Sequence, residues 1–321
     1  MSDETIEKTF QVTDPARLII SNIRGSVTIQ NGEANVIDVK AVKHGSFDSN
    51  KYRIEMTQES DGSVHIETRS SDSTFGFFSQ PPKVEYIVHV PQGIHLDASC
   101  ISSGLNVSGL TGIFKLKTVS GDSNLVELTG PFKFNAVSGD ISGSRLTGVL
   151  ELDSVSGRVH LMESTFPAAN ASTVSGDIVL QTSLSDGPYQ FSSVSGNVRI
   201  IAPADTHCNA ELSSVSGSIR SSFPTTTTRL GYGQKVTLVQ GGGTAVRLKS
   251  VSGDLSIETE GIPPTAVQTT TMADTLPTPP APPTPPETPP PAPLSTAEIL
   301  QRIESGEMTV DEAIKLMKDQ S

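Results

Sequence analysis

Tryptophan is absent from the 321 residues of this chain, and only two cysteines occur, Cys100 and Cys208. Two cysteines cannot build the disulfide framework that holds many small secreted domains together. Both lie in stretches that alternate like strands, so we expect buried free thiols. A metal site built from these two residues alone is not supported, because zinc takes four ligands.

Positive charge is also scarce, with 23 Lys and Arg against 35 Asp and Glu and a net charge of −12. This balance excludes a general affinity for nucleic-acid backbone or anionic membrane, since both select for Lys and Arg. No apolar run of 18 residues occurs, and the segment from Met1 to Lys8 is polar and acidic. We therefore expect no transmembrane segment and no signal peptide, and hence a cytoplasmic protein.

What the chain does contain is a repeated tripeptide. Val-Ser-Gly occurs seven times, beginning at Val119, Val137, Val155, Val174, Val194, Val215 and Val251. The start-to-start spacings are 18, 18, 19, 20, 21 and 36 residues, the last being about two repeats. A period near 20 residues indicates one supersecondary unit stacked on itself.

The residues before each motif alternate with period two, as in a strand with one buried face. In the first repeat Phe114 and Leu116 flank Lys115, and the later repeats follow the same scheme. Aligned columns of this kind predict an all-β fold, a parallel β-helix or solenoid whose coils stack about 4.8 Å apart. The glycine of each motif is predicted to take the tight corner, where positive φ favours glycine. These structural corners are Gly121, Gly139, Gly157, Gly176, Gly196, Gly217 and Gly253.

The pattern divides the chain into four parts. Residues 1–100 alternate in short runs separated by turn signals such as Asn31-Gly32, which predicts an antiparallel β meander or small sandwich that caps one end. Residues 101–262 form the predicted solenoid. The missing motif between Val215 and Val251 predicts a longer excursion or a coil with different corners.

The last two parts differ in composition from the rest. Residues 263–293 hold 13 of the 22 prolines, which predicts a polyproline II linker. Residues 294–321 predict a helical hairpin, because apolar residues recur at helical spacing on both sides of Ser305-Gly306. Two helices of about two turns each cannot be stable alone, so this tail is expected to dock on itself in trans, on the solenoid or on another protein. Its candidate contact residues are Ile299, Leu300, Ile303, Ile314, Leu316 and Met317.

The Val-Ser-Gly-Asp corners and the step from Val88 to Gly93 resemble the bacterial family of unknown function labelled putative adhesins, over roughly residues 10 to 260. The resemblance implies a single-stranded, right-handed β-helix and a scaffold or sensor role, with no catalytic residues to carry over. Residues 299–317 are similar to the short SHOCT-like helical module. That module accompanies this β domain in proteins of the Lia-type envelope-stress response.

Four corners carry an aspartate after the glycine, and stacked carboxylates suit Ca²⁺ binding or acid–base work on a glycan. These residues are Asp122, Asp140, Asp177 and Asp254. The column is interrupted by Arg158, Asn197 and Ser218, and Asp beside Gly is ordinary turn chemistry, so we interpret it as structural.

The six histidines show no metal-ligand spacing, and the repeated serines have no repeated histidine partner. The sequence thus predicts no catalytic residue, no metal site and no cofactor.

Three phenylalanines, Phe75, Phe77 and Phe78, cluster in one predicted loop of a chain with only 15 aromatic residues. They either fill the core at the end of the solenoid or form a tip that contacts a partner or a membrane. Membrane association is expected only through such a loop or through a partner.

The leading hypothesis is a non-enzymatic β-solenoid scaffold that binds a protein partner, or self-associates, through its C-terminal helices. It does not bind nucleic acid, and the resemblance implies a role in cell-envelope stress sensing or regulation. One alternative is a carbohydrate-binding or carbohydrate-active β-helix, which a cleft lined by carboxylates and aromatic rings would favour. A second alternative is an exported surface adhesin.

Overall fold

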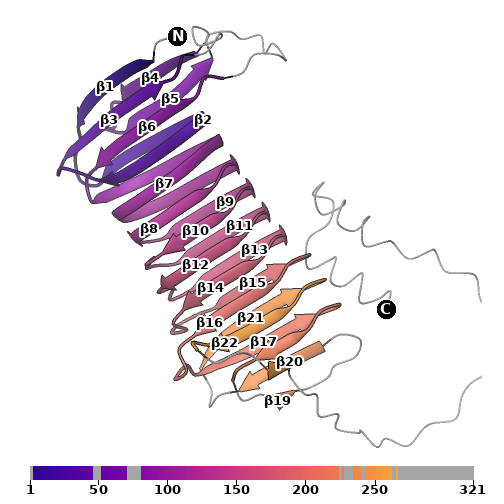
Figure 1. Cartoon of the computed structure of the whole chain (residues 1–321). Coiled ribbons are helices and arrows are strands. Elements are labelled where there is room, and N and C mark those ends of the chain that lie inside the picture. Colours follow the sequence, from indigo (N-terminus) through magenta and orange to yellow (C-terminus); the bar gives the residue numbers. More distant parts are fainter. Residues whose placement is uncertain are drawn as a thin grey trace, which may run out of the picture.

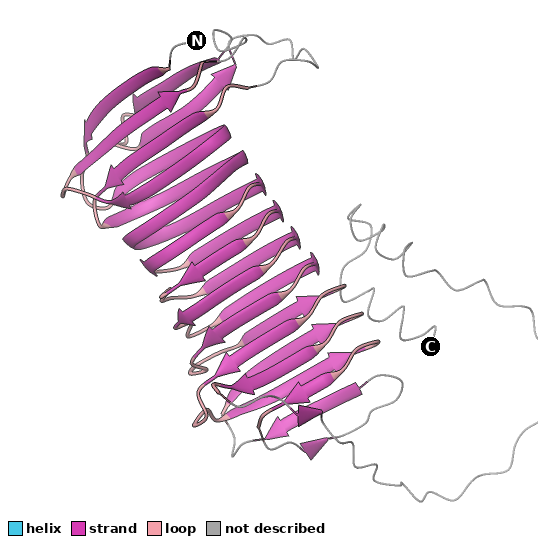
Figure 2. Cartoon of the chain, viewed as in Figure 1, coloured by secondary structure: helices cyan, strands magenta, loops and turns pink. Residues whose placement is uncertain are grey.

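The computed structural model describes residues 3–45, 52–70, 81–223, 226–227, 234–239, 243–261 and 265–266. Within them the regular elements are strands, stacked into one long rod (Figures 1 and 2). The all-β solenoid that the repeats predict is therefore confirmed. Phe75, Phe77 and Phe78 lie outside the described residues. The predicted linker, apart from Thr265–Ala266, also lies outside them. The same holds for the tail, with its candidate contact residues Ile299, Leu300, Ile303, Ile314, Leu316 and Met317.

Each central coil contributes one strand to each of two layers. Layer A, in spatial order, contains β9 (Phe132–Ser138), β11 (Leu150–Ser156), β13 (Ala169–Ser175), β15 (Tyr189–Ser193), β21 (Thr244–Ser250) and β17 (Cys208–Ser214). Layer B contains β8 (Ser123–Thr129), β10 (Ile141–Ser144), β12 (Val159–Ser164), β14 (Ile178–Thr182), β16 (Val198–Ala202), β22 (Leu255–Thr259) and β18 (Ile219–Ser221). The long strand β7 (Gly93–Ser120) pairs with both β8 and β9 and so enters both layers.

The parallel register places each repeat position on the same position of the next coil. Phe132 pairs with Phe114 on one side and with Leu150 on the other, as the aligned columns predict. The rings of Phe114 and Phe132 stack at 5.3 Å between centroids. The inward residues of the coils join one continuous hydrophobic cluster that runs along the rod. Because every coil buries its apolar face only against its neighbours, the stack stabilises all coils together.

The N-terminal strands are antiparallel only in part. β1 (Glu4–Gln11), β3 (Val36–Lys43) and β6 (Val84–Val90) pair antiparallel, as do β4 (Tyr52–Gln58) and β5 (Val64–Ser70). β2 (Ala16–Asn31), however, runs parallel to β5, β6 and β7 and lies between them (Figure 1). The prediction of a purely antiparallel meander is wrong for β2, because the period-two alternation of a strand is the same in both directions.

The C-terminal coils are not stacked in sequence order. The coil of β21 and β22, which carries the last Val-Ser-Gly, is inserted between the coil of β15 and β16 and that of β17 and β18 (Figure 1). The missing motif marks an excursion through β19 (Thr226–Thr227) and β20 (Gln234–Val239). β20 then covers β17 antiparallel, and β23 (Thr265–Ala266) covers β18 antiparallel. Each end of the rod is thus closed by strands that reverse direction.

The seven corner glycines lie at the bends that lead from layer A to layer B. Positive φ, the expected reason for glycine, is found at Gly139 (+122°) and Gly157 (+114°) but not at the other five. What all seven share is close contact with the coil next to them. A Cβ atom there would lie 2.0–2.4 Å from a backbone carbonyl oxygen of the neighbouring corner. Glycine is therefore required mainly by the approach of two backbones.

This distinction can be tested by two substitutions. Gly176→Ala introduces a methyl group 2.0 Å from the Gly157 carbonyl oxygen without a positive φ, whereas Gly62→Ala introduces one into open space at a φ of +84°. We expect a loss of about 3 kcal/mol or more for Gly176→Ala, because two backbones must move apart. For Gly62→Ala we expect about 1 kcal/mol of backbone strain. Urea unfolding followed by circular dichroism measures both, and equal losses would contradict the close-contact explanation.

Candidate interaction surface

The aspartates at the corners form a hydrogen-bonded ladder between coils. Asp122 Oδ1 accepts the backbone N–H of Asp140 at 2.9 Å, and Asp140 Oδ1 accepts that of Arg158 at 2.8 Å. In later coils Asp177 accepts from Asn197, Asn197 from Asp254 and Asp254 from Ser218, at 2.8–2.9 Å. The carboxylate oxygens therefore satisfy backbone donors at bends where strand pairing is interrupted.

The interruptions in this column now have a physical explanation. Asn197 performs the same task as an aspartate because its amide oxygen accepts the same kind of bond. Arg158 and Ser218 donate their backbone N–H to the column. An oxygen acceptor at the corner, with or without charge, is all that the ladder needs.

Among the residues that the structure describes, no three His, Cys, Asp or Glu side chains are placed to hold a metal ion. His89, one of the histidines near Cys100 in the sequence, contacts Gln30 Nε2 at 2.6 Å. Both cysteines are buried free thiols, as predicted. Burial raises the pKa of the Cys100 thiol to about 11, against a smaller opposing effect of its hydrogen bond to Ser103.

The outward faces of both layers carry charges that pair along the stack. In layer A, Lys115 pairs with Asp97 at 3.0 Å and Lys133 with Glu151 at 2.6 Å. In layer B, Arg145 lies between Glu127 and Glu163, at 2.9 and 3.7 Å. These exposed pairs add little stability individually. They do place an opposite charge beside Lys115 and Lys133, which are themselves direct register partners on β7 and β9.

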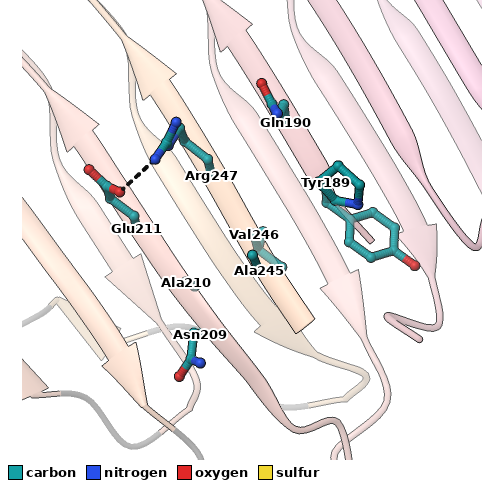
Figure 3. Close-up of a pocket in the computed structure, with 9 residues that line it drawn as sticks. Tyr189, Gln190, Asn209, Ala210, Glu211, Ala245, Val246 and Arg247 are labelled. Atoms are coloured by element: carbon teal, nitrogen blue, oxygen red, sulfur yellow. Dashed lines mark hydrogen bonds and ion pairs between the residues drawn. The ribbon is translucent and has the colours of Figure 1, made fainter. Parts of the chain in front are cut away.

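A pocket of about 360 Å³ lies on the outer side of layer A, where β15, β21 and β17 adjoin. Figure 3 shows Arg247 and Glu211 on neighbouring strands, joined by an ion pair of 3.3 Å. The aromatic residue of the pocket, Tyr189, is fully buried, and its hydroxyl donates a hydrogen bond to the Phe166 carbonyl oxygen. With one carboxylate and no exposed ring, the pocket does not have the lining that the carbohydrate hypothesis requires.

The more informative surface is apolar. Ile101, Val119, Val137 and Val155, each 18 residues apart, are 37–50% exposed and form a line along one side of layer A. We call these four residues the apolar strip. A groove of about 360 Å³ beside the first three is lined also by Ser99, Cys100, Lys117, Thr118, Asn135 and Ala136. Four large aliphatic side chains aligned in this way form a candidate contact surface.

The exposure of the strip is not a requirement of the Val-Ser-Gly corner. Val194 and Val251, the same motif position in later coils, are only 2% and 1% exposed. In those coils β15 and β21 end one residue before the valine, and the chain bends there. In β9 and β11 the strand continues through the valine, so alternation directs it outward. The outward direction of these valines can be predicted from the sequence, since continuing the period-two pattern by one residue makes each valine outward-facing.

Within the described part of the chain, no helix is long and apolar enough to span a membrane.

Comparison with known proteins finds one family model and several solved structures of low sequence identity. A family model described as Toastrack DUF4097 matches residues 16–258. No curated protein matches the chain. A solved structure titled a putative adhesin from Parabacteroides distasonis ATCC 8503 is 14% identical, with a TM-score of 0.43, covering 80% of this chain and 97% of that one. A putative adhesin from Bacteroides fragilis NCTC 9343 is 12% identical, with a TM-score of 0.40 and coverages of 79% and 97%. A putative lipid binding protein, also from Parabacteroides distasonis, is 11% identical, with a TM-score of 0.41 and coverages of 80% and 96%.

The structural role of the aspartate ladder predicts how Asp177 tolerates substitution. Asp177→Asn keeps the oxygen that accepts the Asn197 N–H, so stability should change by less than about 0.5 kcal/mol. Asp177→Ala removes the acceptor and should cost about 1 kcal/mol. Thermal melts with and without Ca²⁺ measure both effects. A melting temperature that Ca²⁺ raises in the wild type but not in Asp177→Asn would favour a cation site instead.

Proposed function

This chain belongs to the Toastrack DUF4097 family, and from that premise we propose that it is a non-enzymatic scaffold that works by binding proteins. The apolar strip is the observation that carries the proposal. Ile101, Val119 and Val137 border a groove whose lining is mostly apolar, on the side of a rod with closed ends. Covering such a surface removes aliphatic side chains from water, which favours association.

The second interaction element in this proposal is the C-terminal tail. Its apolar residues lie at helical spacing on two predicted helices that are too short to be stable alone. Helices of this kind become stable when their apolar faces are covered, so the tail mediates self-association or docking to a partner protein. The proline-rich segment between rod and tail serves as a spacer that extends the reach of the tail.

The process that we propose is sensing or regulation of cell-envelope stress. The resemblance of residues 299–317 to the SHOCT-like module supports this, together with the family of the β domain. A rod with a tethered binding module suits the assembly of a complex, because the rod provides one contact surface and the tail a second one linked to it.

Substitutions in the tail test this function. Leu300→Asp with Leu316→Asp places a charge on the apolar face of each predicted helix, so we expect loss of self-association or of partner binding. The matched control is Gln301→Asp with Gln320→Asp, which adds the same charge at polar positions. Light scattering measures the mass of the purified chain, and capture from stressed and unstressed cells identifies bound proteins. An unchanged mass together with an unchanged set of bound proteins in the Leu300/Leu316 variant would refute the proposed function.

A further inference from the structure

We propose that the apolar strip is the docking site for the C-terminal tail, residues 296–318, of a second copy of this chain. The inference rests on the proposed function and specifies one partner for it. Four properties of the molecule support it: the closed ends of the rod, the dimensions of the strip, the charge of the tail, and the length of the spacer.

The ends of the rod do not offer a surface for stacking one copy on another. At the C-terminal end the parallel order is interrupted by antiparallel β20 and by β23, which is two residues long. At the other end the outermost described strands are β1 in layer B, which carries Glu4, Glu7 and Lys8, and β4 in layer A, which carries Arg53 and Glu55. Short, reversed or charged edge strands oppose edge-to-edge pairing. Self-association that avoids these ends uses a side of the rod, where the strip is an exposed line of four aliphatic residues.

The strip has the dimensions of a short helix. Ile101 and Val155 are three coil spacings apart, which is about 14 Å. A ten-residue helix is about 15 Å long and presents apolar residues every three or four positions. The tail supplies two such segments, with Ile299, Leu300 and Ile303 in the first and Ile314, Leu316 and Met317 in the second.

Charge favours the same pairing. Lys117 lines the groove beside Val119. Residues 294–321 contain six acidic and three basic side chains, so the tail is negatively charged. An acidic segment is therefore attracted to Lys117, the charged residue of the groove lining, although the gain is modest at an exposed site.

The length of the spacer favours a second copy over the same chain. The last described strand, β23, lies beside β18, five coil spacings from Val155 and eight from Ile101, or about 24 to 38 Å along the axis. Residues 277–293 alone, as polyproline II, extend about 50 Å. A stiff spacer that exceeds the required span lowers the effective concentration of the tail at its own strip. Two copies that exchange tails form a closed, symmetric dimer in which both strips are covered.

A complementation experiment with the full chain tests this exchange. In the strip variant, Val119→Asp with Val137→Asp, the tail is intact but the docking surface is charged. In the tail variant, Leu300→Asp with Leu316→Asp, the surface is intact but the tail is not. We expect each variant alone to dissociate about a hundredfold more readily than the wild type, since an unpaired charge would be buried. An equimolar mixture should recover a heterodimer, because one intact tail meets one intact strip.

The matched control is Ile113→Asp with Val149→Asp. These residues lie at the other end of the layer A strands and are 47% and 50% exposed, as Val119 and Val137 are 46% and 48% exposed. This control should sediment like the wild type across the concentration range, and circular dichroism should show that every variant remains folded.

The outcomes separate this inference from the proposed function. A mixture of the two variants that stays monomeric, or a strip variant that associates like the wild type, would overturn the inference. If the tail variant alone then loses association, the tail still mediates assembly and only the strip assignment fails. If the wild type is a monomer whose tail amides are protected from hydrogen exchange, the tail docks on its own rod. That result would also overturn the swapping of tails between two copies. If neither variant changes the mass or the bound proteins, the proposed function fails as well.

Discussion

The structure depends on one constraint, the parallel stacking of coils with each repeat position on its equivalent. Hydrogen bonding between neighbouring coils brings identical backbone atoms within a single strand spacing of each other. At the bend from layer A to layer B the spacing is so small that a Cβ atom would meet the carbonyl oxygen of the adjacent corner at 2.0–2.4 Å. One glycine in each repeat follows directly from this geometry. So does the aspartate ladder, since the bend that excludes side chains also leaves an N–H that needs an acceptor.

Much of this architecture could be predicted from the sequence because the constraint acts on every repeat. Columns of apolar residues such as Phe114, Phe132 and Leu150, and the glycines at the bends, are visible as soon as the motifs are aligned. The conformational reason for the glycines could not be predicted, because a close backbone approach and a positive φ select the same residue. Only coordinates separate the two, and they show a positive φ at Gly139 and Gly157 among the seven.

Spatial order is the part of the fold that the repeats did not encode. Local alternation specifies which face of a strand is buried but not which strand lies beside it. β2 is enclosed between β5 and β6 on one side and β7 on the other, and the coil of β21 and β22 is enclosed between two earlier coils. In both places a coil is held from two sides, while antiparallel strands cover the outside. The motif missing between Val215 and Val251 indicated an irregularity, but nothing in its length specified an insertion.

The candidate surface has the same origin as the fold. A repeat that makes a buried apolar column necessarily aligns whatever the outward positions contain, so exposed residues also form lines. Where the outward residue is charged, its side chain can pair with an opposite charge on a neighbouring coil, as Lys133 does with Glu151. At Val119, Val137 and Val155 the outward residue is aliphatic, and stacking converts three ordinary surface valines into a continuous apolar line. The motif does not require this exposure, since Val194 and Val251, in coils whose strands end one residue earlier, are buried. The exposed line is therefore a property of particular coils and not of the repeat, which is what a binding surface on a repetitive scaffold requires.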